Sequence, residues 1–534
     1  MDPTTLHDSD RELLAWIAQN LGITPDVALC RLLDETGDGP VTTRIEDGRL
    51  AALDLRVLGR EIRWAIGEDA ELKLPTRLLD ACRELDCSGL GLDRLNTDAL
   101  GELRVLECAD NRLVELDVGP LRHLEWLVIP GNRLMILDLR RCPDVRHVDC
   151  SGNQLAVLML PELSRLTVLR CGRNQLMGLE VGNQPVLREL TAARNALVRI
   201  EIGDCPELES LDGSYNELQH LGLSTSLPSL ATLTCSDNSL AALPVDLMPG
   251  LRRLCARRNY LATLDLRGCP HLETVDVDRN QLQELHVGGP ALRDVSCGDN
   301  RLVTLDIGAC PALEILRVHE NELAALDLGG LGSLVALDAR SNRLTSLDLS
   351  GAPGIGWLDL RKNPLQFVDL ERHRDLFAVE IDRGIPVGCT PPQSDLWFSP
   401  SIPKPFQGAT AGQLHRFVRT WTGPAADRVF LDVVRSPKCD LGTALYAYWT
   451  SSPHHFLQFT SREQVAAWEQ DTWDLLVAVE ERLANGGFAT SAIPFDPAAD
   501  RQARSLKLHD WTQAPPGVTP VRSIPEGLYR RSGG

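Results

Sequence analysis

The chain has 534 residues, of which 54 are Lys or Arg and 74 are Asp or Glu, so its formal net charge at pH 7 is -20. This acidic balance argues against binding of nucleic acid or an anionic membrane by the chain as a whole, because phosphate binding needs a basic surface. The sequence begins without a cationic segment followed by an apolar one, and it contains no run of about 18 apolar residues. We therefore expect neither secretion nor membrane spanning, and a cytoplasmic location is predicted.

Residues 1–40 are predicted to form a helical cap. Ser9 or Asp10 can begin a first helix that ends at Gly22, and Pro25 is well placed to begin a second. Two short helices joined by a glycine could also form a helix-turn-helix. The acidic residues around them favour a cap over the first repeat instead.

Residues 41–383 are predicted to form a solenoid, because one pattern recurs with a period of 21 residues. Leucine or cysteine occupies positions 103, 106, 108, 113 and 116 around Asn111, and the other turns follow this frame. Each unit is expected to add one short strand to a parallel sheet, and each asparagine amide to bond backbone groups where the chain leaves the strand. The asparagines of this ladder are Asn111, Asn132, Asn153, Asn174, Asn195, Asn216, Asn238, Asn259, Asn280, Asn300, Asn321, Asn342 and Asn363.

The first turns depart from the frame. Residues 46–55 match its second half, which would place Gly48 at the asparagine position, and Leu90 occupies that position two periods later. In later turns the second half contains an alternating Leu-Asp-Leu, as at residues 137–139. Such alternation indicates a second short extended segment in each turn.

The frame L-x-x-L-x-(L or C)-x-x-N-x-L-x-x-L-D-L resembles that of the bacterial leucine-rich repeats of the 21-residue IRREKO type. The resemblance implies a fold and carries no activity with it. The expected fold class is α/β: a leucine-rich repeat solenoid with a parallel concave sheet, followed by a mainly α-helical C-terminal domain. Because repeat solenoids mostly present surfaces that hold other molecules, binding is the expected function.

The chain has 15 cysteines, and most have a place in the repeat. Four precede a proline on the returning segment. Six more occupy the core position three residues before the asparagine position, where cysteine acts as a small apolar residue, so we expect free thiols. These six are Cys87, Cys108, Cys150, Cys171, Cys235 and Cys297.

The composition changes after the repeats. Residues 384–409 are rich in proline and are predicted to be a linker, residues 410–511 a helical domain, and residues 512–534 a mobile tail. Four helices are expected in the domain, at 410–421, 425–434, 441–450 and in a long stretch that begins at Ser461.

The segment 437–445, Pro-Lys-Cys-Asp-Leu-Gly-Thr-Ala-Leu, resembles the core of a bacterial domain family of unknown function marked by C-D-L-G-T-A-L. Cys439 precedes a presumed helix start, where a thiolate would be favoured, so a nucleophile is conceivable. No spacing supports this hypothesis, and structural packing is the preferred interpretation. Effector ubiquitin ligases use a Cys-x-Asp arrangement, whereas Cys439 and Asp440 are adjacent. The candidate bases would be His415, His454 and His455.

The concave face is predicted to consist of the residues six, four, two and one before each asparagine, because side chains that flank inward leucines point outward. These positions hold 13 acidic and 11 basic residues, so the face is mixed although the chain is acidic. Neighbouring opposite charges there could simply pair. Arginine and aromatic side chains are the usual anchors of interfaces. The predicted partner-binding residues are Trp126, Arg170, Arg173, Arg194, Tyr215, Arg253, Arg257, Arg258, Arg317 and Trp357.

No cofactor or metal is expected, since the sequence has no Cys-x-x-Cys or His-x-x-x-His pair. Asp276, Asp278, Asp294 and Asp299 could hold calcium, but the mixed charges nearby disfavour it. The predicted function is a protein-binding scaffold whose concave face holds a protein partner. Two alternatives remain: an effector or enzyme in which the repeats select a target that the C-terminal domain modifies, and a toxin-neutralising (immunity) protein.

Overall fold

The computed structural model places the chain in two compact units, one of residues 1–292 and 296–309 and the other of residues 293–295 and 310–534. Among the residues it describes, no single helix is long and apolar enough to span a membrane, although the first two helices, bent by 99° at their break, together have the length and composition for it. The described residues are 6–21, 23–34, 43–47, 49–56, 74–373, 376, 378–382, 385–388, 431, 433–435, 439, 443–444, 447, 465 and 470–484.

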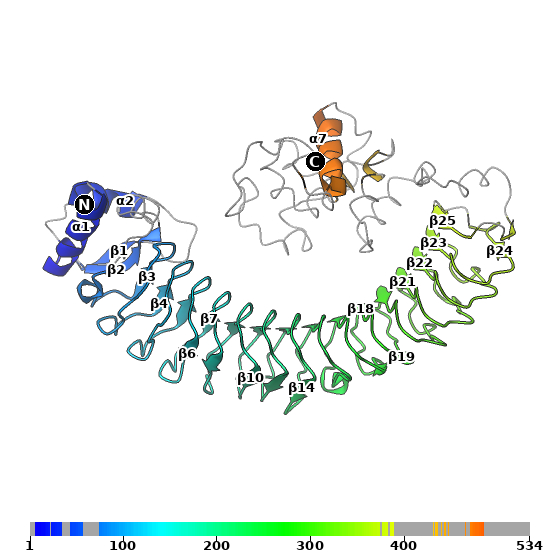
Figure 1. The fold of residues 1–534 in the computed structure, drawn as a ribbon, viewed down its shortest axis with the longest axis horizontal. Helices are drawn as coiled ribbons and strands as arrows, with labels where there is room; N and C mark the ends of the chain where they lie inside the picture. Colours follow the sequence, from blue (N-terminus) through cyan, green and yellow to red (C-terminus); the bar gives the residue numbers. More distant parts are fainter. Residues whose placement is uncertain are drawn as a thin grey trace. The chain divides into compact units, whose positions relative to one another are not determined.

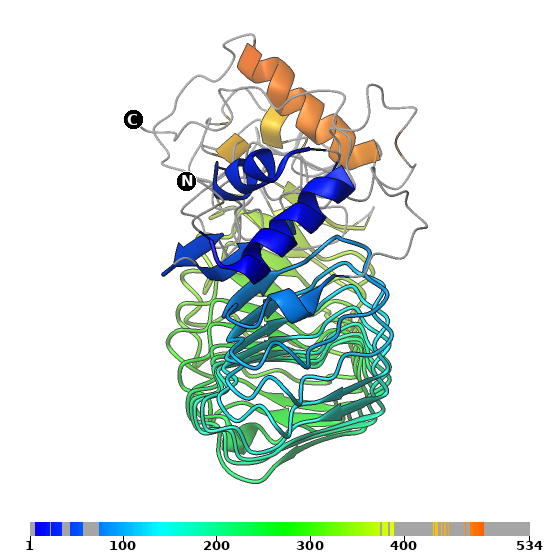
Figure 2. The same cartoon turned by 90° about the vertical axis from the view of Figure 1, so that its left-hand side faces the viewer.

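The first unit begins with the two expected helices, α1 (Asp8–Leu21) and α2 (Pro25–Asp34). Asp10 lies inside α1 and is not its cap. Its buried carboxylate accepts hydrogen bonds from Nε of Arg49 at 3.0 Å and from the backbone N–H of Leu50 at 3.3 Å. The helix is thereby joined to the first strand of the sheet, and Figure 2 shows α1 lying against the first turns.

The predicted register of the first turn is wrong. Strands β1 (Arg44–Glu46) and β2 (Arg49–Asp54) form an antiparallel hairpin, and β2 pairs in parallel with β3 (Glu84–Asp86), so that Leu53 lies opposite Leu85. This segment is therefore the first half of a repeat, and Gly48 is not at the asparagine position. Both halves of a repeat alternate apolar and polar residues, so the pattern alone does not distinguish them.

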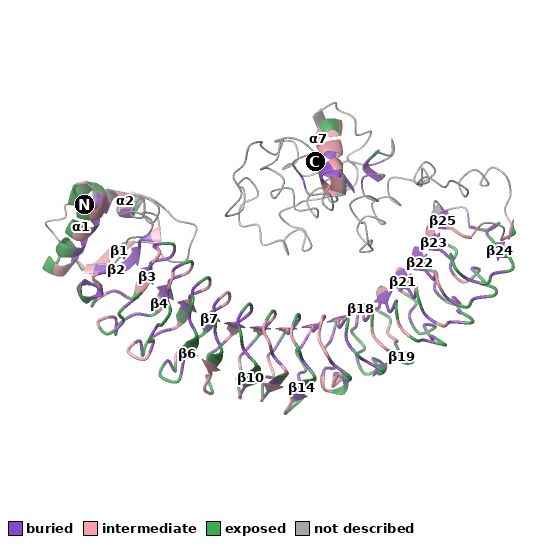
Figure 3. Cartoon of the chain, in the orientation of Figure 1, coloured by how far each residue is buried: buried purple, intermediate pink, exposed green. Residues whose placement is uncertain are grey.

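Each following turn adds a strand of three residues to a parallel sheet. The middle residue of one strand lies opposite that of the next, as Leu106, Leu127 and Val148 do, and all three are fully buried. In Figure 1 these strands follow one another along one side of the first unit, and in Figure 3 they are largely buried. The strands are β4 (Val105–Glu107), β5 (Trp126–Val128), β7 (His147–Asp149), β9 (Val168–Arg170), β11 (Glu189–Thr191), β13 (Ser210–Asp212), β15 (Thr232–Thr234), β16 (Arg253–Cys255) and β18 (Thr274–Asp276).

The predicted second extended segment is confirmed in several turns. It forms three small parallel sheets, β6–β8, β10–β12–β14 and β17–β19, on the opposite side of the first unit in Figure 1. Residues 113–118 lack such a strand. The strands are β6 (Ile136–Asp138), β8 (Val157–Met159), β10 (Gly178–Val181), β12 (Arg199–Ile202), β14 (His220–Leu223), β17 (Thr263–Asp265) and β19 (Glu284–His286).

The asparagine ladder joins neighbouring turns. Oδ1 of Asn259 accepts the backbone N–H of Leu240 at 2.9 Å, and its Nδ2 donates to the carbonyls of Cys235 at 3.0 Å and Ala256 at 3.1 Å. The same three bonds recur at Asn111 and at Asn300. One amide thus satisfies a donor and two acceptors that have left the sheet. The thirteen cysteines whose side chains the structure describes are free thiols, as expected.

The second unit continues the same kind of turn. Strands β21 (Ile315–Arg317), β22 (Ala336–Asp338), β23 (Trp357–Asp359) and β25 (Ala378–Glu380) pair in parallel and in sequence, and β20 (Asp294–Ser296) begins in this unit. β24 (Val368–Asp369) pairs with β26 (Val387–Gly388), so repeat-like pairing continues beyond residue 383.

Beyond the repeats, the structure describes one complete helix, α7 (Gln470–Ala484), whose Leu475, Leu476 and Val479 are buried. Val465 lies at a bend, so the predicted long helix does not run unbroken from Ser461. The described residues within 425–434 and 441–450 are helical, namely 431, 433, 434, 443, 444 and 447. The helix predicted at 410–421, most of the linker and the tail lie outside the described residues.

Candidate protein-binding face

The residue before each asparagine has a left-handed backbone. Its φ is 54° at Arg173, 59° at Arg194, 56° at Tyr215 and 54° at Arg258, and Gly131 has the same conformation at 68°. Left-handed φ is uncommon outside glycine and costs free energy that the surrounding ladder must offset. The side chains at this position form a row along one border of the concave face.

The best defined cluster on the first unit lies on β5, β7, β9 and β11. Because Trp126 and His147 are opposite each other in neighbouring strands, their rings stack at 3.9 Å with an angle of 4° between the planes. Arg170 holds Glu189 through two bonds, Nε to Oε1 at 2.7 Å and Nη2 to Oε2 at 3.0 Å. Burial, and then the charge of Arg170, lowers the pKa of His147, so the imidazole in the stack is neutral at pH 7.

Further along the face, Arg194 and Tyr215 form a second pair. Cζ of Arg194 lies 4.4 Å from the centre of the Tyr215 ring, a cation–π geometry. Both side chains are exposed, and Tyr215 retains 49% of its surface. Arg173 is also exposed in the row. This part of the face therefore presents arginine and aromatic surface to the solvent.

The acidic side chains of the same turns point back to their own backbone. Oδ1 of Asp149 accepts the N–H of Ser151 at 3.0 Å, and Oδ1 of Asp212 accepts the N–H of Ser214 at 3.0 Å. The carboxylate of Glu189 is already held by Arg170. The mixed charge counted in the sequence is thus uneven in space, because Asp149 and Asp212 bond their own turns and Glu189 pairs with Arg170, while Arg173 and Arg194 are exposed.

Arg253, Arg257 and Arg258 are not equivalent. Arg253 is exposed on β16, whereas Arg258 pairs with Asp237 at 3.0 Å. Arg257 is half-buried, and its Nε is buried without a hydrogen-bond partner among the described residues. Arg253 and Arg258 are therefore both exposed to solvent, whereas Arg257 is not.

The two predicted residues of the second unit differ from those of the first. Arg317 is only 7% exposed, and its Nη1 bonds Oδ1 of Asp294 at 2.9 Å, so it stabilises the sheet and is a poor anchor. Trp357 on β23 is half-buried.

The residue that the sequence analysis missed is His147. It was not counted because it is neither an arginine nor one of the larger aromatic residues, yet it lies 21 residues after Trp126, at the same position of the next turn. In a parallel repeat, residues one period apart lie side by side. That spacing alone predicts that the two rings are neighbours.

The described residues show no arrangement that would support a nucleophilic Cys439 or a calcium site. Cys439 is fully buried, while a nucleophilic thiol must reach its substrate. The candidate bases His415, His454 and His455 lie outside the described residues. Asp278 of the calcium hypothesis already accepts hydrogen bonds from Ser296 Oγ at 2.8 Å and Gly298 N at 2.7 Å.

Comparison with known proteins finds a family model that matches one segment of the chain, and a group of solved structures with a similar fold. Residues 409–484 match the family described as a domain of unknown function, DUF4274. No curated protein matches the chain. The chain is similar to the functional domain of InlJ from Listeria monocytogenes, with 24% identity, 57% of this chain and 70% of that chain covered, and a TM-score of 0.45.

Two further solved structures are similar. YopM, a leucine-rich effector protein from Yersinia pestis, has 26% identity over 57% of this chain and 90% of that chain, with a TM-score of 0.42. A leucine-rich repeat protein from Leptospira interrogans has 20% identity over 55% of this chain and 94% of that chain, with a TM-score of 0.35. The structures that resemble this parallel-sheet solenoid include bacterial leucine-rich repeat proteins.

Proposed function

We propose that the chain is a cytoplasmic protein-binding scaffold and that it holds its partner on the concave face of the first unit, between Trp126 and Tyr215. The observation that carries the proposal is the Arg194–Tyr215 pair, which is exposed and prearranged. Side chains held in one geometry lose little conformational entropy when they bind.

The charge distribution indicates the kind of partner. In the row of residues that precede the asparagines, Arg173 and Arg194 are the charged residues between Gly131 and Tyr215, and both are exposed. A complementary partner presents carboxylates or aromatic rings there. The free thiols fit a reducing compartment, which supports the cytoplasmic location.

The test is affinity capture of partners from the cells that make the protein, comparing wild type with the double variant Arg194→Ala and Tyr215→Ala. Loss of the captured protein from the variant is the expected result. The matched control is Arg199→Ala with Tyr260→Ala, which removes an exposed arginine and an exposed tyrosine outside the concave face. Equal capture by wild type and the Arg194 and Tyr215 variant would show that another surface binds.

The effector or enzyme alternative depends on Cys439, and no observation favours it over packing. A buried thiol is small and apolar in its effect. The toxin-neutralising alternative is a special case of protein binding, and the capture experiment identifies it if the partner is a toxin.

A further inference from the structure

A second surface of the first unit is also shaped for contact. Its side chains come three or four residues after the asparagines of consecutive turns, outside the leucine pattern. Met135 is 56% exposed, Ile136 54% and Met177 71%. We call this set the apolar stripe, and it comprises Val114, Met135, Ile136, Val157 and Met177.

The fold does not require these residues to be apolar. Gln219 and Gln283 occupy the same position as Met135 in later turns and serve the solenoid equally well. Val303, also in this register, is a single exposed apolar residue, which is ordinary on a protein surface. A continuous stripe over four neighbouring turns is not ordinary, and such patches mark sites of interaction.

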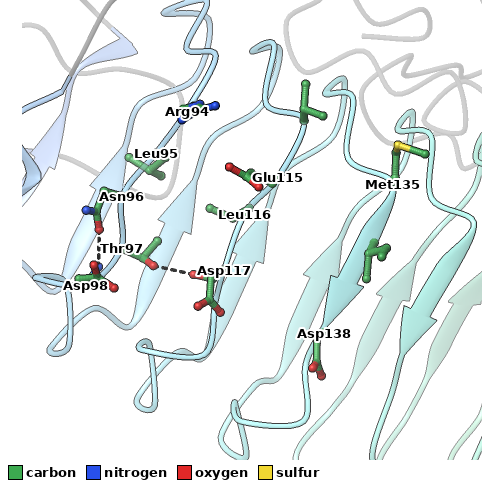
Figure 4. Close-up of a pocket in the computed structure, with 12 residues that line it drawn as sticks. Arg94, Leu95, Asn96, Thr97, Asp98, Glu115, Leu116, Asp117, Met135 and Asp138 are labelled. Atoms are coloured by element: carbon green, nitrogen blue, oxygen red, sulfur yellow. Dashed lines mark hydrogen bonds between the residues drawn. The ribbon is translucent and has the colours of Figure 1, made fainter.

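A groove runs along one end of the stripe. It has a volume of about 460 Å³ and is lined from three successive turns, including Val114. Leu95 and Met135 line it from the turns on either side (Figure 4). β6 pairs with β8 on one side, but no backbone hydrogen bond joins residues 114–117 to residues 135–138, all of which are described. The outer segments of these turns are therefore open to a partner.

The border of the groove is acidic. Asp98, Glu115 and Asp117 line it and are exposed, whereas Arg94 is its one cationic side chain. Asp138 also lines it and is held by Arg140 at 2.7 Å. Oppositely charged partners are favoured at such a rim and like-charged ones are repelled.

This charge pattern selects among possible occupants. A second copy of the chain would bring the acidic borders together, and an anionic lipid surface would be repelled in the same way. A segment with apolar and basic residues satisfies both the stripe and its border. Two of the five methionines of the chain lie in the stripe, and flexible methionine surfaces adapt well to apolar partners.

The spacing of the stripe indicates the conformation of the occupant. Neighbouring turns of a parallel sheet are about 4.8 Å apart, so the four turns from Val114 to Met177 span about 14 Å. In a helix, four apolar residues at i, i+3, i+7 and i+10 lie on one face and span about 15 Å along the axis, which matches the span of the four turns. A helix can therefore place one apolar side chain against each turn.

We propose that the apolar stripe and its acidic groove form a docking surface for a basic amphipathic helix of a protein partner, separate from the concave face. The probe is a synthetic peptide of about 18 residues with leucines at the apolar positions of a helix and lysines elsewhere. Its binding to the full chain is measured by fluorescence anisotropy at about 0.15 M salt, where distant charges are screened. A second peptide carries glutamate in place of every lysine.

We expect the lysine peptide to bind and the glutamate peptide not to bind. The double variant Met135→Ser and Ile136→Ser should weaken binding at least about tenfold, and Glu115→Lys should weaken it independently. Val303→Ser is the matched control and should leave the affinity unchanged. Because all four residues are exposed, thermal melts should show that the variants fold.

The proposal is overturned if the Met135 and Ile136 variant binds the lysine peptide as tightly as wild type does, since attraction to the net charge would then explain the binding. It is also overturned if neither peptide binds at about 100 µM, or if both peptides bind equally. None of these three results bears on the concave face, which the Arg194 and Tyr215 variant tests.

Discussion

The asparagine ladder predicts a defined cost for a single side chain. In Asn259→Ala, the backbone N–H of Leu240 loses its acceptor at 2.9 Å, and no other acceptor for it occurs among the described residues. The carbonyls of Cys235 and Ala256 each keep a second donor, Nδ2 of Asn238 and of Asn280, both at 3.0 Å. One orphaned buried donor costs about 1 to 3 kcal/mol, so we expect a destabilisation of about 2 kcal/mol.

Hydrogen exchange measures this loss of stability at the Leu240 amide itself. A local loss of about 2 kcal/mol should speed exchange of the Leu240 amide roughly thirtyfold, and the melting temperature should fall. Tyr260→Ala is the control, because Tyr260 adjoins Asn259 but is 56% exposed. If Asn259→Ala exchanges at the wild-type rate at Leu240 and melts at the same temperature, the ladder does not hold the turns together.

Two further predictions concern buried ionisable groups. Burial, and then Asp86, raises the pKa of Glu107 from 4.5 to about 7, with Asp54 acting in the same direction and Arg56 opposing it. Because the pKa of Glu107 is higher in the folded protein than in the unfolded chain, the folded protein loses stability as the pH rises from 4.5 through 7. Glu107→Gln cannot ionise, so it should melt at a higher temperature than wild type at pH 8.5 and at the same temperature at pH 4.5. The reverse order would contradict this. Cys439 should react with iodoacetamide only after unfolding, since its side chain is fully buried, and rapid alkylation of the folded protein would restore the enzyme alternative.

The regular part of the fold was predictable because a single spacing encodes it. The 21-residue period located the asparagines, and each of them makes the bonds that an amide can make at the end of a strand. The first turn was not predictable, since residues 46–55 alternate in a way that suits either half of the repeat. Only the pairing of Leu53 with Leu85 decides its register.

The sequence predicts which residues occupy the positions of the binding face, but it does not predict which of them are paired, buried or exposed. The sequence places Arg170 and Arg194 on the face, but it does not show that Glu189 neutralises the first while Tyr215 supports the second. Arg317 illustrates the same limit, because its burial arises from neighbouring turns. The left-handed φ before each asparagine is also hidden, since arginine, tyrosine and aspartate all occur there.

The central claim is that a protein partner contacts the concave face of the first unit. The most direct measurement replaces Tyr215 with p-benzoylphenylalanine in the full chain and crosslinks it by light inside the cells that make the protein. Tyr260, replaced in the same way, is the control because its exposure of 56% is close to the 49% of Tyr215. We predict one discrete crosslinked protein from position 215, lost with Arg194→Ala and absent from position 260. Crosslinks from position 260 alone, or none from position 215, would contradict the account.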